Sequence, residues 1–359
     1  MNYNESRIKA VRSSLEKEDC SAVYITNLTN IRYLSGFTGS SGSCFISDKM
    51  AYFVSDGRYQ TQSKEEVRDM EIIISNKPHI ETLVSKGIIT SKQKIAFEAD
   101  DISINGLNNI KTIVSDCTWV ETTQLVEKIA MVKDEHEILS TRTAIEITDA
   151  VFEQIIPEVR PGAIEKEIAA KISFACKILG AETDAFEPII ASGVRSALPH
   201  AKPTEKIIEQ GDFVVLDFGA KYDGYHADMT RTIVAGKATS KHSEIYNIVY
   251  EAQKCGCEAA IHGIECKEID SVCREYINKK GYKKFFNHNT GHGLGLEIHT
   301  NPRFSPVSND KVYENYIMTI EPGIYLPNFG GVRIEDDILI KRDGYEILNH
   351  STKELLEIK

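Results

Sequence analysis

An aspartate lies inside an apolar run that is otherwise typical of a buried β-strand. The run spans Phe213–Ala220, reads Phe-Val-Val-Leu-Asp-Phe-Gly-Ala, and has Asp217 near its centre. A carboxylate in such a strand loses its hydration, which is costly unless a proton or a cation compensates its charge. We therefore expect the fold to bring a partner to Asp217.

A second aspartate follows at a spacing that suggests a hairpin. Asp228 comes eleven residues after Asp217, and Lys221–Gly224 between them has hairpin-turn chemistry. If these four residues form the loop, the two aspartates oppose each other with Cβ atoms about 4.5–5.5 Å apart. They would then need a shared proton or cations between them. The alternative is that one aspartate pairs with Arg231 and the other is solvated.

Two glutamates repeat this arrangement further along the sequence. Glu321 ends one strand-like segment and Glu335 lies in the next, with Pro327–Gly330 as the loop between them. The midpoint of the two glutamates is residue 328, so we expect them to oppose each other as well. Two pairs of buried acids on hairpins are a pattern that packing alone would not favour.

A glycine-rich loop adds histidines to these acids. His292 lies between Gly291 and Gly293, which would let a ligand or a metal approach the backbone, and His299 follows seven residues later. Neutral imidazole is a common metal ligand. Alone, this loop fits a packed or exposed histidine equally well, but beside four carboxylates it indicates a metal site.

The ligand types suggest which ions would bind. Two divalent cations would balance the charge of four carboxylates, and oxygen-rich ligation favours manganese, although cobalt, iron or zinc fit as well. A dinuclear centre can activate water and polarise a carbonyl group. The sequence therefore predicts hydrolytic chemistry.

The rest of the sequence predicts an α+β protein of two domains, residues 1–127 and 128–359. The first has short β-branched and aromatic runs, expected to be strands at 22–26, 43–47, 51–55, 71–75 and 94–98, and helical patterns at 5–18 and 57–69. The second has helical patterns at 133–159, 164–180, 243–262 and 267–280, with strands between 185 and 236 and a mainly β-structured remainder. Gly36–Gly42 lacks the ending of a P-loop and is expected to be a flexible loop between strands.

Composition excludes several classes of protein. The chain of 359 residues is 42% apolar and 26% charged, as in soluble globular proteins. Its formal charge of −11 argues against sequence-independent nucleic-acid binding, although a local basic pocket is not excluded. We expect no secretory signal and no membrane span, because long apolar runs are lacking. Eight cysteines without a Cys-x-x-Cys pair argue against a structural zinc site and favour the cytoplasm.

At these residues the sequence resembles the pita-bread metallopeptidases, which include Xaa-Pro aminopeptidases, Xaa-Pro dipeptidases (prolidases) and methionine aminopeptidases. The second half carries the resemblance in ASGVRSALPHAKPT, VVLDFGA, HADMTRT, NTGHGLGLEIH, IEPGIY and GVRIEDD. NIRYLSGFTGSSG in the first half resembles the N-terminal domain of the Xaa-Pro members, which methionine aminopeptidases generally lack. The resemblance implies a C-terminal pita-bread (creatinase/aminopeptidase) fold and a smaller N-terminal creatinase-like α/β domain.

The resemblance also implies a set of metal ligands. Asp217 would chelate one metal, Asp228 and Glu335 would bridge both, and His292 and Glu321 would complete the two shells. Glu321 would also assist proton transfer during catalysis.

Four further residues match family positions outside the ligand set. His200 and His299 match histidines that bind substrate or stabilise the developing oxyanion, and His288 matches an additional active-site histidine of some members. Arg333 matches an arginine that supports the active site. Structurally, these histidines could be surface or packing residues, and Arg333 could pair with a nearby carboxylate. One departure is Thr300-Asn301-Pro302 after His299, where relatives often carry an acid, which puts fine specificity in doubt.

We therefore expect a metal-dependent exopeptidase, an Xaa-Pro aminopeptidase, that uses hydroxide activated on a dinuclear centre to hydrolyse the bond between an N-terminal residue and a following proline. The alternatives are an Xaa-Pro dipeptidase (prolidase) and, from another class, a non-catalytic pita-bread module that binds peptides. The expected partners are Xaa-Pro peptides, with neither nucleic acid nor a membrane involved. The resemblance further suggests a cytoplasmic homodimer.

Overall fold

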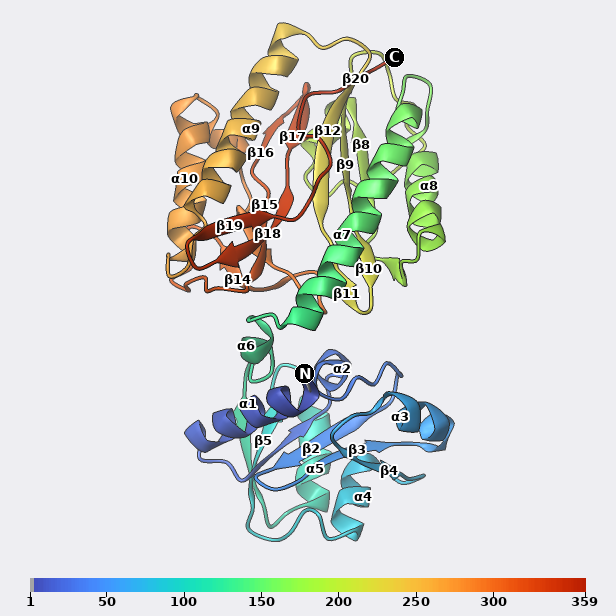
Figure 1. Ribbon diagram of the computed structural model, residues 1–359, viewed down its shortest axis with the longest axis vertical. Coiled ribbons are helices and arrows are strands. Elements are labelled where there is room, and N and C mark those ends of the chain that lie inside the picture. Colours follow the sequence, from blue (N-terminus) through green and yellow to red (C-terminus); the bar gives the residue numbers. More distant parts are fainter. Residues whose placement is uncertain (1–2) are drawn as a thin grey trace. The chain divides into compact units, whose positions relative to one another are not determined.

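The computed structural model describes residues 3–359 (Figure 1). The chain divides into two compact units, Met1–Ala130 and Met131–Lys359. The predicted boundary after residue 127 lies three residues before this division.

The first unit is built on a six-stranded mixed sheet in the order β4-β3-β2-β1-β5-β6. The central strand β1 pairs antiparallel with β2 and parallel with β5. The five predicted strands are confirmed to within one residue, but β6 was missed because this edge strand is only partly buried. The strands are β1 (Ala22–Ile25), β2 (Ser43–Ser47), β3 (Ala51–Ser55), β4 (Glu71–Ile74), β5 (Lys94–Glu98) and β6 (Thr118–Thr122).

Helices pack on this sheet through apolar faces. Helix α1 buries Ile8, Val11 and Leu15 at helical spacing, and α4 and α5 share a core with strand β1. Gly36–Gly42 is a loop as predicted, but it joins α2 to β2 rather than two strands. The helices are α1 (Tyr3–Lys17), α2 (Leu28–Ser35), α3 (Gln60–Glu66) after the 3₁₀ turn η1 (Gly57–Tyr59), α4 (His79–Ser85), α5 (Ile104–Ile113) and α6 (Glu127–Ala130).

The second unit has two pairs of helices outside its sheets, which is the expected α+β pita-bread arrangement (Figure 1). Helices α7 (Glu135–Ile155) and α8 (Glu165–Ile178) share a core with the sheet β20-β12-β9-β8. Helices α9 (Ser240–Ala259) and α10 (Cys266–Lys279) share a second hydrophobic core with the sheet β14-β13-β15-β18-β19 and the hairpin β16-β17. All four helices were predicted, with ends within four residues of those observed.

The strands of this unit are short, and several end where the candidate site residues lie. They are β7 (Thr183–Asp184), β8 (Ile189–Ser192), β9 (Phe213–Phe218), β10 (Ala220–Tyr222), β11 (Tyr225–His226), β12 (Met229–Ala235), β13 (Gly291–Gly293), β14 (Thr300–Phe304), β15 (Ile317–Ile320), β16 (Gly323–Leu326), β17 (Gly330–Arg333), β18 (Asp336–Lys341), β19 (Gly344–Ile347) and β20 (Glu357–Ile358). The 3₁₀ turns are η2 (Ile156–Glu158), η3 (Gly193–Ala197) and η4 (Lys283–Phe285). Over residues 3–359, we find no helix with the length and apolar character needed to cross a membrane.

Candidate metal centre

The two aspartates lie on one hairpin, but they are not directly opposite each other. Asp217 on β9 pairs with Thr230 on β12. The strands continue further than predicted and leave only Asp223-Gly224 as the turn, with positive φ angles of 48° and 83°. This is the two-residue turn that Asp-Gly favours. The predicted opposition of Asp217 and Asp228 is therefore wrong by two residues, because the expected four-residue loop was centred one residue too early.

Both aspartates are nevertheless buried near each other. Asp228 lies two residues before Thr230, which keeps its side chain on the same face of the hairpin as Asp217. The two residues are 5% and 7% exposed, so neither is solvated. The backbone N–H of Asp228 donates to a carboxylate oxygen of Asp337 at 3.0 Å. The alternative in which one aspartate pairs with Arg231 is wrong, because that arginine binds Asp336 instead.

The second hairpin has the predicted register. Ile320 pairs with Asp336 on one side of the two glutamates and Gly323 with Arg333 on the other. Both pairs belong to a single register, in which residue 321 stands across from residue 335. The loop between them is three residues long and is centred on Asn328, as predicted.

His292 completes the cluster from strand β13. Its Nε2 atom lies 3.6 Å from Oδ2 of Asp228 and 3.5 Å from Oε1 of Glu321. Asp228, His292 and Glu335 each offer one ligand atom, and these three atoms lie within 4.8 Å of one another. All three residues are buried, so the fold brings together side chains that were far apart in the sequence.

The glycines beside His292 have a different role from the expected one. A Cβ atom on Gly291 would lie 2.0 Å from the carbonyl oxygen of Thr319, and one on Gly293 would lie 2.4 Å from Oγ1 of Thr300. The glycines therefore make room for the neighbouring strands β15 and β14 rather than for a ligand. Their absence of side chains lets His292 approach the strands that carry Glu321 and Glu335.

The charges of the cluster are poorly compensated by the protein alone. Burial, followed by the charges of neighbouring carboxylates, raises the pKa values of Asp228 and Glu335 well above their usual range. Burial likewise raises the pKa of Glu321 to about 8. Burial and the nearby His299 lower the pKa of His292 to about 3, so this imidazole is neutral and free to bind a cation.

Unsatisfied oxygens indicate where a cation would bind. Among the described residues, Oδ1 of Asp217, Oδ1 of Asp228 and Oε1 of Glu335 are buried without a hydrogen-bond partner. Buried polar atoms are rarely left in this state. Carboxylate oxygens with one neutral imidazole are a suitable donor set for divalent first-row metals. The residues present therefore fit a metal centre.

Arg333 supports this cluster from the side of Asp217. Its Nη2 group donates to Oδ2 of Asp217, and its Nε donates to Oγ1 of Thr230 at 3.1 Å. Its Nη1 group donates to the hydroxyl of Tyr325 at 2.8 Å and to the carbonyl of Pro199 at 3.1 Å. The arginine thus pairs with a carboxylate, as expected structurally, although the partner is on β9 rather than next to Glu335.

The three other predicted histidines lie around the cluster. His299 stacks edge-on against His292 with ring centres 4.4 Å apart, and it is exposed on its other side. His288 accepts a hydrogen bond at Nε2 from the hydroxyl of Tyr325 at 2.8 Å, and its Nδ1 lies 3.8 Å from Oε2 of Glu321. His200 is exposed, and after burial it is one of the smaller causes that lower the pKa values of His288 and His299, which places it near both. His200 and His299 are therefore accessible to a bound molecule, and His288 lies beside Glu321.

Three polar residues around the site were missed by the sequence analysis. Tyr325 joins His288 to Arg333, Thr230 contacts Glu335 at 2.6 Å, and Asp337 holds the backbone of Asp228. A tyrosine or a threonine in an apolar strand is unremarkable by itself. Asp337 carried a usable signal, because it continues the run of acids from Glu335 inside a buried strand.

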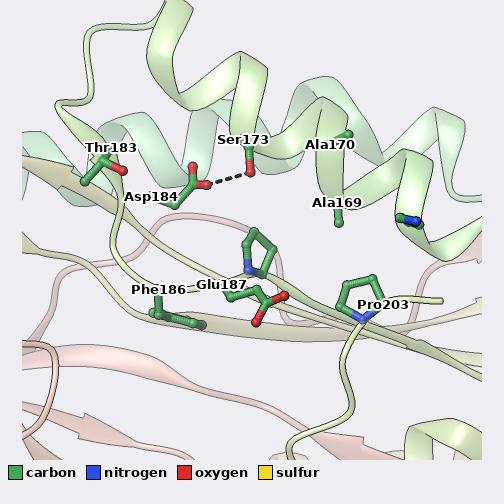
Figure 2. A pocket seen from close by; sticks show the side chains of 10 residues that line it. Ala169, Ala170, Ser173, Thr183, Asp184, Phe186, Glu187 and Pro203 are labelled. Atoms are coloured by element: carbon green, nitrogen blue, oxygen red, sulfur yellow. Dashed lines mark hydrogen bonds between the residues drawn. The ribbon is translucent and has the colours of Figure 1, made fainter.

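A groove elsewhere in the second unit lies between α8 and the segment around β7 (Figure 2). It has a volume of about 560 Å³, and Ser173 donates a 2.6 Å hydrogen bond to Asp184 at its wall. Its lining contains none of the nine predicted site residues. The groove is therefore separate from the candidate metal centre.

Comparison with known proteins assigns both units. Residues 140–342 match the profile of metallopeptidase family M24, and residues 7–132 match that of the creatinase/prolidase N-terminal domain. The solved structure of an Xaa-Pro dipeptidase from Bacillus anthracis is 39% identical, with a TM-score of 0.95 over 99% of this chain and 100% of that one. An X-Pro aminopeptidase structure from Thermotoga maritima is 37% identical, with a TM-score of 0.89 over 98% and 99%.

A third relative extends the match to the curated sequences. The Xaa-Pro dipeptidase of Pyrococcus horikoshii is 36% identical over 99% of this chain and 100% of its own length. These matches run through both units and include every strand that carries a candidate ligand. With its buried acids and histidine on a pita-bread fold, the chain is a hydrolase that belongs to metallopeptidase family M24.

Proposed function

We propose that the protein is an Xaa-Pro dipeptidase, a prolidase, that hydrolyses dipeptides with proline as the second residue. The proposal rests on the cluster of four carboxylates and His292 in a chain of family M24, and all of these residues except the partly exposed Glu321 are buried. Two of the three relatives described above have the name Xaa-Pro dipeptidase, which favours this alternative over the Xaa-Pro aminopeptidase expected from the sequence. The Thermotoga maritima relative keeps the aminopeptidase as the second candidate.

We infer that the cluster binds two divalent ions. The residues that would hold them are Asp217, Asp228, His292, Glu321 and Glu335. Four carboxylates match the charge of two divalent cations, and the unpartnered buried oxygens of three of them support a centre with more than one ion. Oxygen-rich ligation favours manganese, and cobalt, zinc and iron are also compatible with these donors.

Ions bound here would supply Lewis-acid polarisation of the scissile carbonyl and activation of the attacking water. The protein would contribute a proton carrier, because the ring nitrogen of the proline, which has no hydrogen in the peptide bond, must gain a proton when the C–N bond breaks and proline leaves as an amine. Glu321 would suit this role, because its carboxylate lies within the cluster, 3.5 Å from Nε2 of His292, where it could take a proton from the attacking water and pass it to the leaving nitrogen.

Three histidines lie around the cluster, where a substrate would be bound. We propose that His299 and His200 stabilise the developing oxyanion or bind the substrate, and that His288 contributes to substrate binding beside Glu321. Both ring nitrogens of His288 have partners: Nε2 accepts from Tyr325, and Nδ1 donates to the carbonyl oxygen of Asn289 at 2.7 Å. These two bonds hold the ring in place beside Glu321. Arg333 would hold Asp217 and Tyr325 in place.

Substrate length is the test of this proposal. We expect the purified protein, loaded with Mn²⁺, to hydrolyse an Xaa-Pro dipeptide and to act much more slowly on a tripeptide with the same first two residues. Comparable kcat/KM values for both peptides would favour the Xaa-Pro aminopeptidase. Failure to cleave either one while Mn²⁺ binds would favour the non-catalytic peptide-binding module.

The assembly and location of the protein belong to the same proposal. A cytoplasmic homodimer is the expected form, as the family resemblance suggests. Light scattering during size-exclusion chromatography measures the mass directly, and a fully active species with the mass of one chain, 40.2 kDa, would contradict the dimer.

A further inference from the structure

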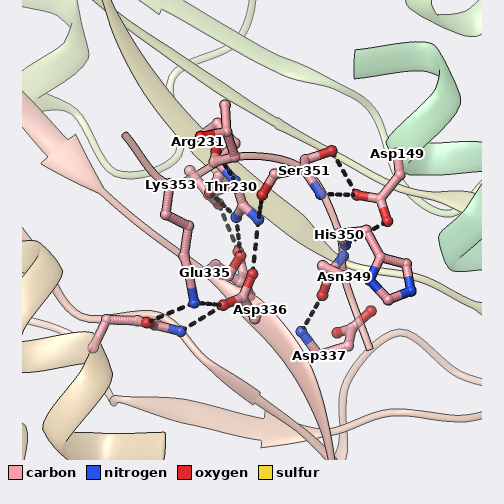
Figure 3. Close-up of polar contacts among 12 residues, drawn as sticks. Asp149, Thr230, Arg231, Glu335, Asp336, Asp337, Asn349, His350, Ser351 and Lys353 are labelled. Atoms are coloured by element: carbon pink, nitrogen blue, oxygen red, sulfur yellow. Dashed lines mark hydrogen bonds and ion pairs between the residues drawn. The ribbon is translucent and has the colours of Figure 1, made fainter. Parts of the chain in front are cut away.

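A buried polar network connects Glu335 and Asp336 to Arg231, Lys353 and the residues around Ser351 (Figure 3). At its centre is Arg231, which is 1% exposed. A guanidinium group has five N–H donors and no acceptor, so burying one requires five acceptors around it. From the sequence, the only role considered for this arginine was an ion pair with Asp217 or Asp228, and in the structure it binds Asp336 instead.

All five donors of Arg231 have acceptors. Nη1 donates to the carbonyl oxygen of Glu335 at 2.5 Å and to that of Thr230 at 3.0 Å. Nη2 donates to Oδ1 of Asp336 at 2.8 Å and to the carbonyl of Ser351 at 2.9 Å, and Nε donates to the carbonyl of Thr352 at 3.0 Å. The arginine therefore ties the backbone of Glu335 to the segment 349–353.

Glu335 is held at every polar group except one. Its N–H donates to the carbonyl of Thr230 at 3.1 Å, its carbonyl accepts from Arg231, and its Oε2 accepts from the hydroxyl of Thr230. Only Oε1 is without a partner among the described residues. Two adjacent residues of β12 thus fix the position from which this oxygen points into the cluster.

The segment 349–353 is itself anchored at two points. Lys353 donates to Oδ2 of Asp336, and Asp149 on α7 accepts from the backbone N–H groups of His350 at 2.7 Å and Ser351 at 3.0 Å. Burial disfavours the charge of Asp336, but Arg231 and Lys353 outweigh this and lower its pKa. Charge in the network is therefore matched, and it does not need the cations of the metal centre.

We propose that Arg231, with Asp336 and Lys353, is a positioning residue for Glu335 that sets the geometry of the metal centre from behind. This inference rests on the proposed role of Glu335 as a metal ligand. Buried ion pairs contribute little net stability compared with apolar residues of the same size, so stability alone is a weak reason for burying three charged side chains here. A fixed backbone behind a ligand, in contrast, determines how well the ligand fits its metal.

Two substitutions test the role. Arg231→Lys keeps the charge but loses the fork that reaches five acceptors, and Lys353→Met removes the second cation of Asp336. We expect each folded variant to bind Mn²⁺ roughly 10- to 100-fold more weakly in calorimetric titration, with Lys353→Met at the lower end. We also expect the visible spectrum of the Co²⁺-saturated variants to differ from that of the wild type.

The matched control is Lys206→Met. Lys206 binds Asp212 at 2.7 Å, and the two side chains are 22% and 14% exposed, similar to the 20% of Lys353. Asp212 directly precedes the start of β9, whereas Asp217 lies near the other end of that strand. The pair of Lys206 and Asp212 is therefore not connected to Glu335. The control should lose comparable thermal stability and keep the wild-type Mn²⁺ affinity and Co²⁺ spectrum.

The outcomes separate this inference from the proposed function. Wild-type Mn²⁺ affinity or an unchanged Co²⁺ spectrum in folded Arg231→Lys and Lys353→Met would overturn the positioning role, and so would a failure of both variants to fold, which would assign the network to stability. If only Arg231→Lys fails to fold, the Mn²⁺ affinity and the Co²⁺ spectrum of Lys353→Met decide whether the positioning role holds. Wild-type Mn²⁺ binding by Glu335→Gln would instead overturn the proposed metal role of Glu335, and the inference would fall with it.

Discussion

The hydroxyl of Thr230 donates a 2.6 Å hydrogen bond to Oε2 of Glu335. The hydroxyl oxygen of Thr230 in turn accepts from Nε of Arg333 at 3.1 Å, and Arg333 also binds Asp217. One neutral side chain thus connects a carboxylate of the second hairpin to an aspartate of the first. Because Oε2 is occupied, Oε1 is the oxygen of Glu335 that faces the cluster.

Replacing Thr230 with valine should weaken metal binding while the chain still folds. Valine has nearly the same shape but leaves Oε2 of Glu335 and Nε of Arg333 without their shared partner, which costs about 1–3 kcal/mol of stability. We expect Mn²⁺ affinity to fall roughly tenfold or more, measured by calorimetric titration.

Thr232→Val is the control for this substitution. Thr232 lies on the same strand and is equally buried, but its hydroxyl bonds only to the backbone of Arg333, at 2.9 Å and 3.2 Å. It should lose stability without losing Mn²⁺ affinity. Equal losses of affinity in both variants would show that the effect comes from the strand in general and not from the bond to Glu335.

Asp228→Asn should abolish turnover without unfolding the protein. The substitution keeps the shape of the side chain but removes a charge from the proposed metal centre. Several kcal/mol of transition-state stabilisation depend on such a centre, so kcat should fall about a thousandfold. Peptide hydrolysis assays at saturating Mn²⁺ measure kcat of the variant and of the wild type. A kcat near that of the wild type would rule out Asp228 as a ligand.

Removing the metal should inactivate and destabilise the protein together. A ligand that binds only the folded chain adds about 2.7 kcal/mol of stability at a concentration of 100 times its Kd. We expect chelation by EDTA to abolish hydrolysis and to lower Tm in calorimetry, and Mn²⁺ or Co²⁺ to restore both. Full activity in a sample that elemental analysis shows to be metal-free would contradict a metal-dependent mechanism.

The stability of the metal-free protein should decrease as pH rises. Burial raises the pKa of Glu321 from 4.5 to about 8, so the folded chain keeps a proton that the unfolded chain releases. This contribution is complete below the unfolded value and is lost as pH rises through the folded one. Tm of the metal-free protein should therefore fall between about pH 5 and about pH 8.

Two comparisons isolate the contribution of Glu321 to this slope. Glu321→Gln cannot release the proton, so its Tm should depend less steeply on pH than that of the wild type. Protein loaded with Mn²⁺ should also show a flatter profile, because bound cations compensate the ionised carboxylates. A metal-free Tm that rises over this range in the wild type, or equal slopes in the wild type and Glu321→Gln, would contradict the raised pKa.

Buried charge was the part of the site that the sequence revealed best. Asp217 and Glu335 interrupt apolar runs, and such interruptions have few explanations other than a partner of opposite charge. Turn chemistry located both hairpins, but it placed one register two residues away from the observed one. The Asp223-Gly224 turn was recognisable, whereas its length depends on how far the flanking strands pair.

The features that could not be predicted from the sequence depend on tertiary packing. Helix α5 contains three asparagines and a glycine, which have low helix propensity, and it forms because Ser103 caps it and Ile110 packs on the sheet. Thr230 bonds to Glu335 and Tyr325 bonds to His288, and in each pair the two residues are more than 30 positions apart. Such partners become visible only when the strands are assembled.

The five acceptors around Arg231 also set an order of events during synthesis. Two of them belong to Ser351 and Thr352, while the arginine itself lies 120 residues earlier. A nascent chain that has emerged only as far as Glu335 already contains every proposed metal ligand, yet Arg231 then lacks three of its acceptors, those of Asp336, Ser351 and Thr352. The surroundings of Glu335 can therefore be completed only after Thr352 has been added, so this part of the fold depends on nearly the whole length of the chain.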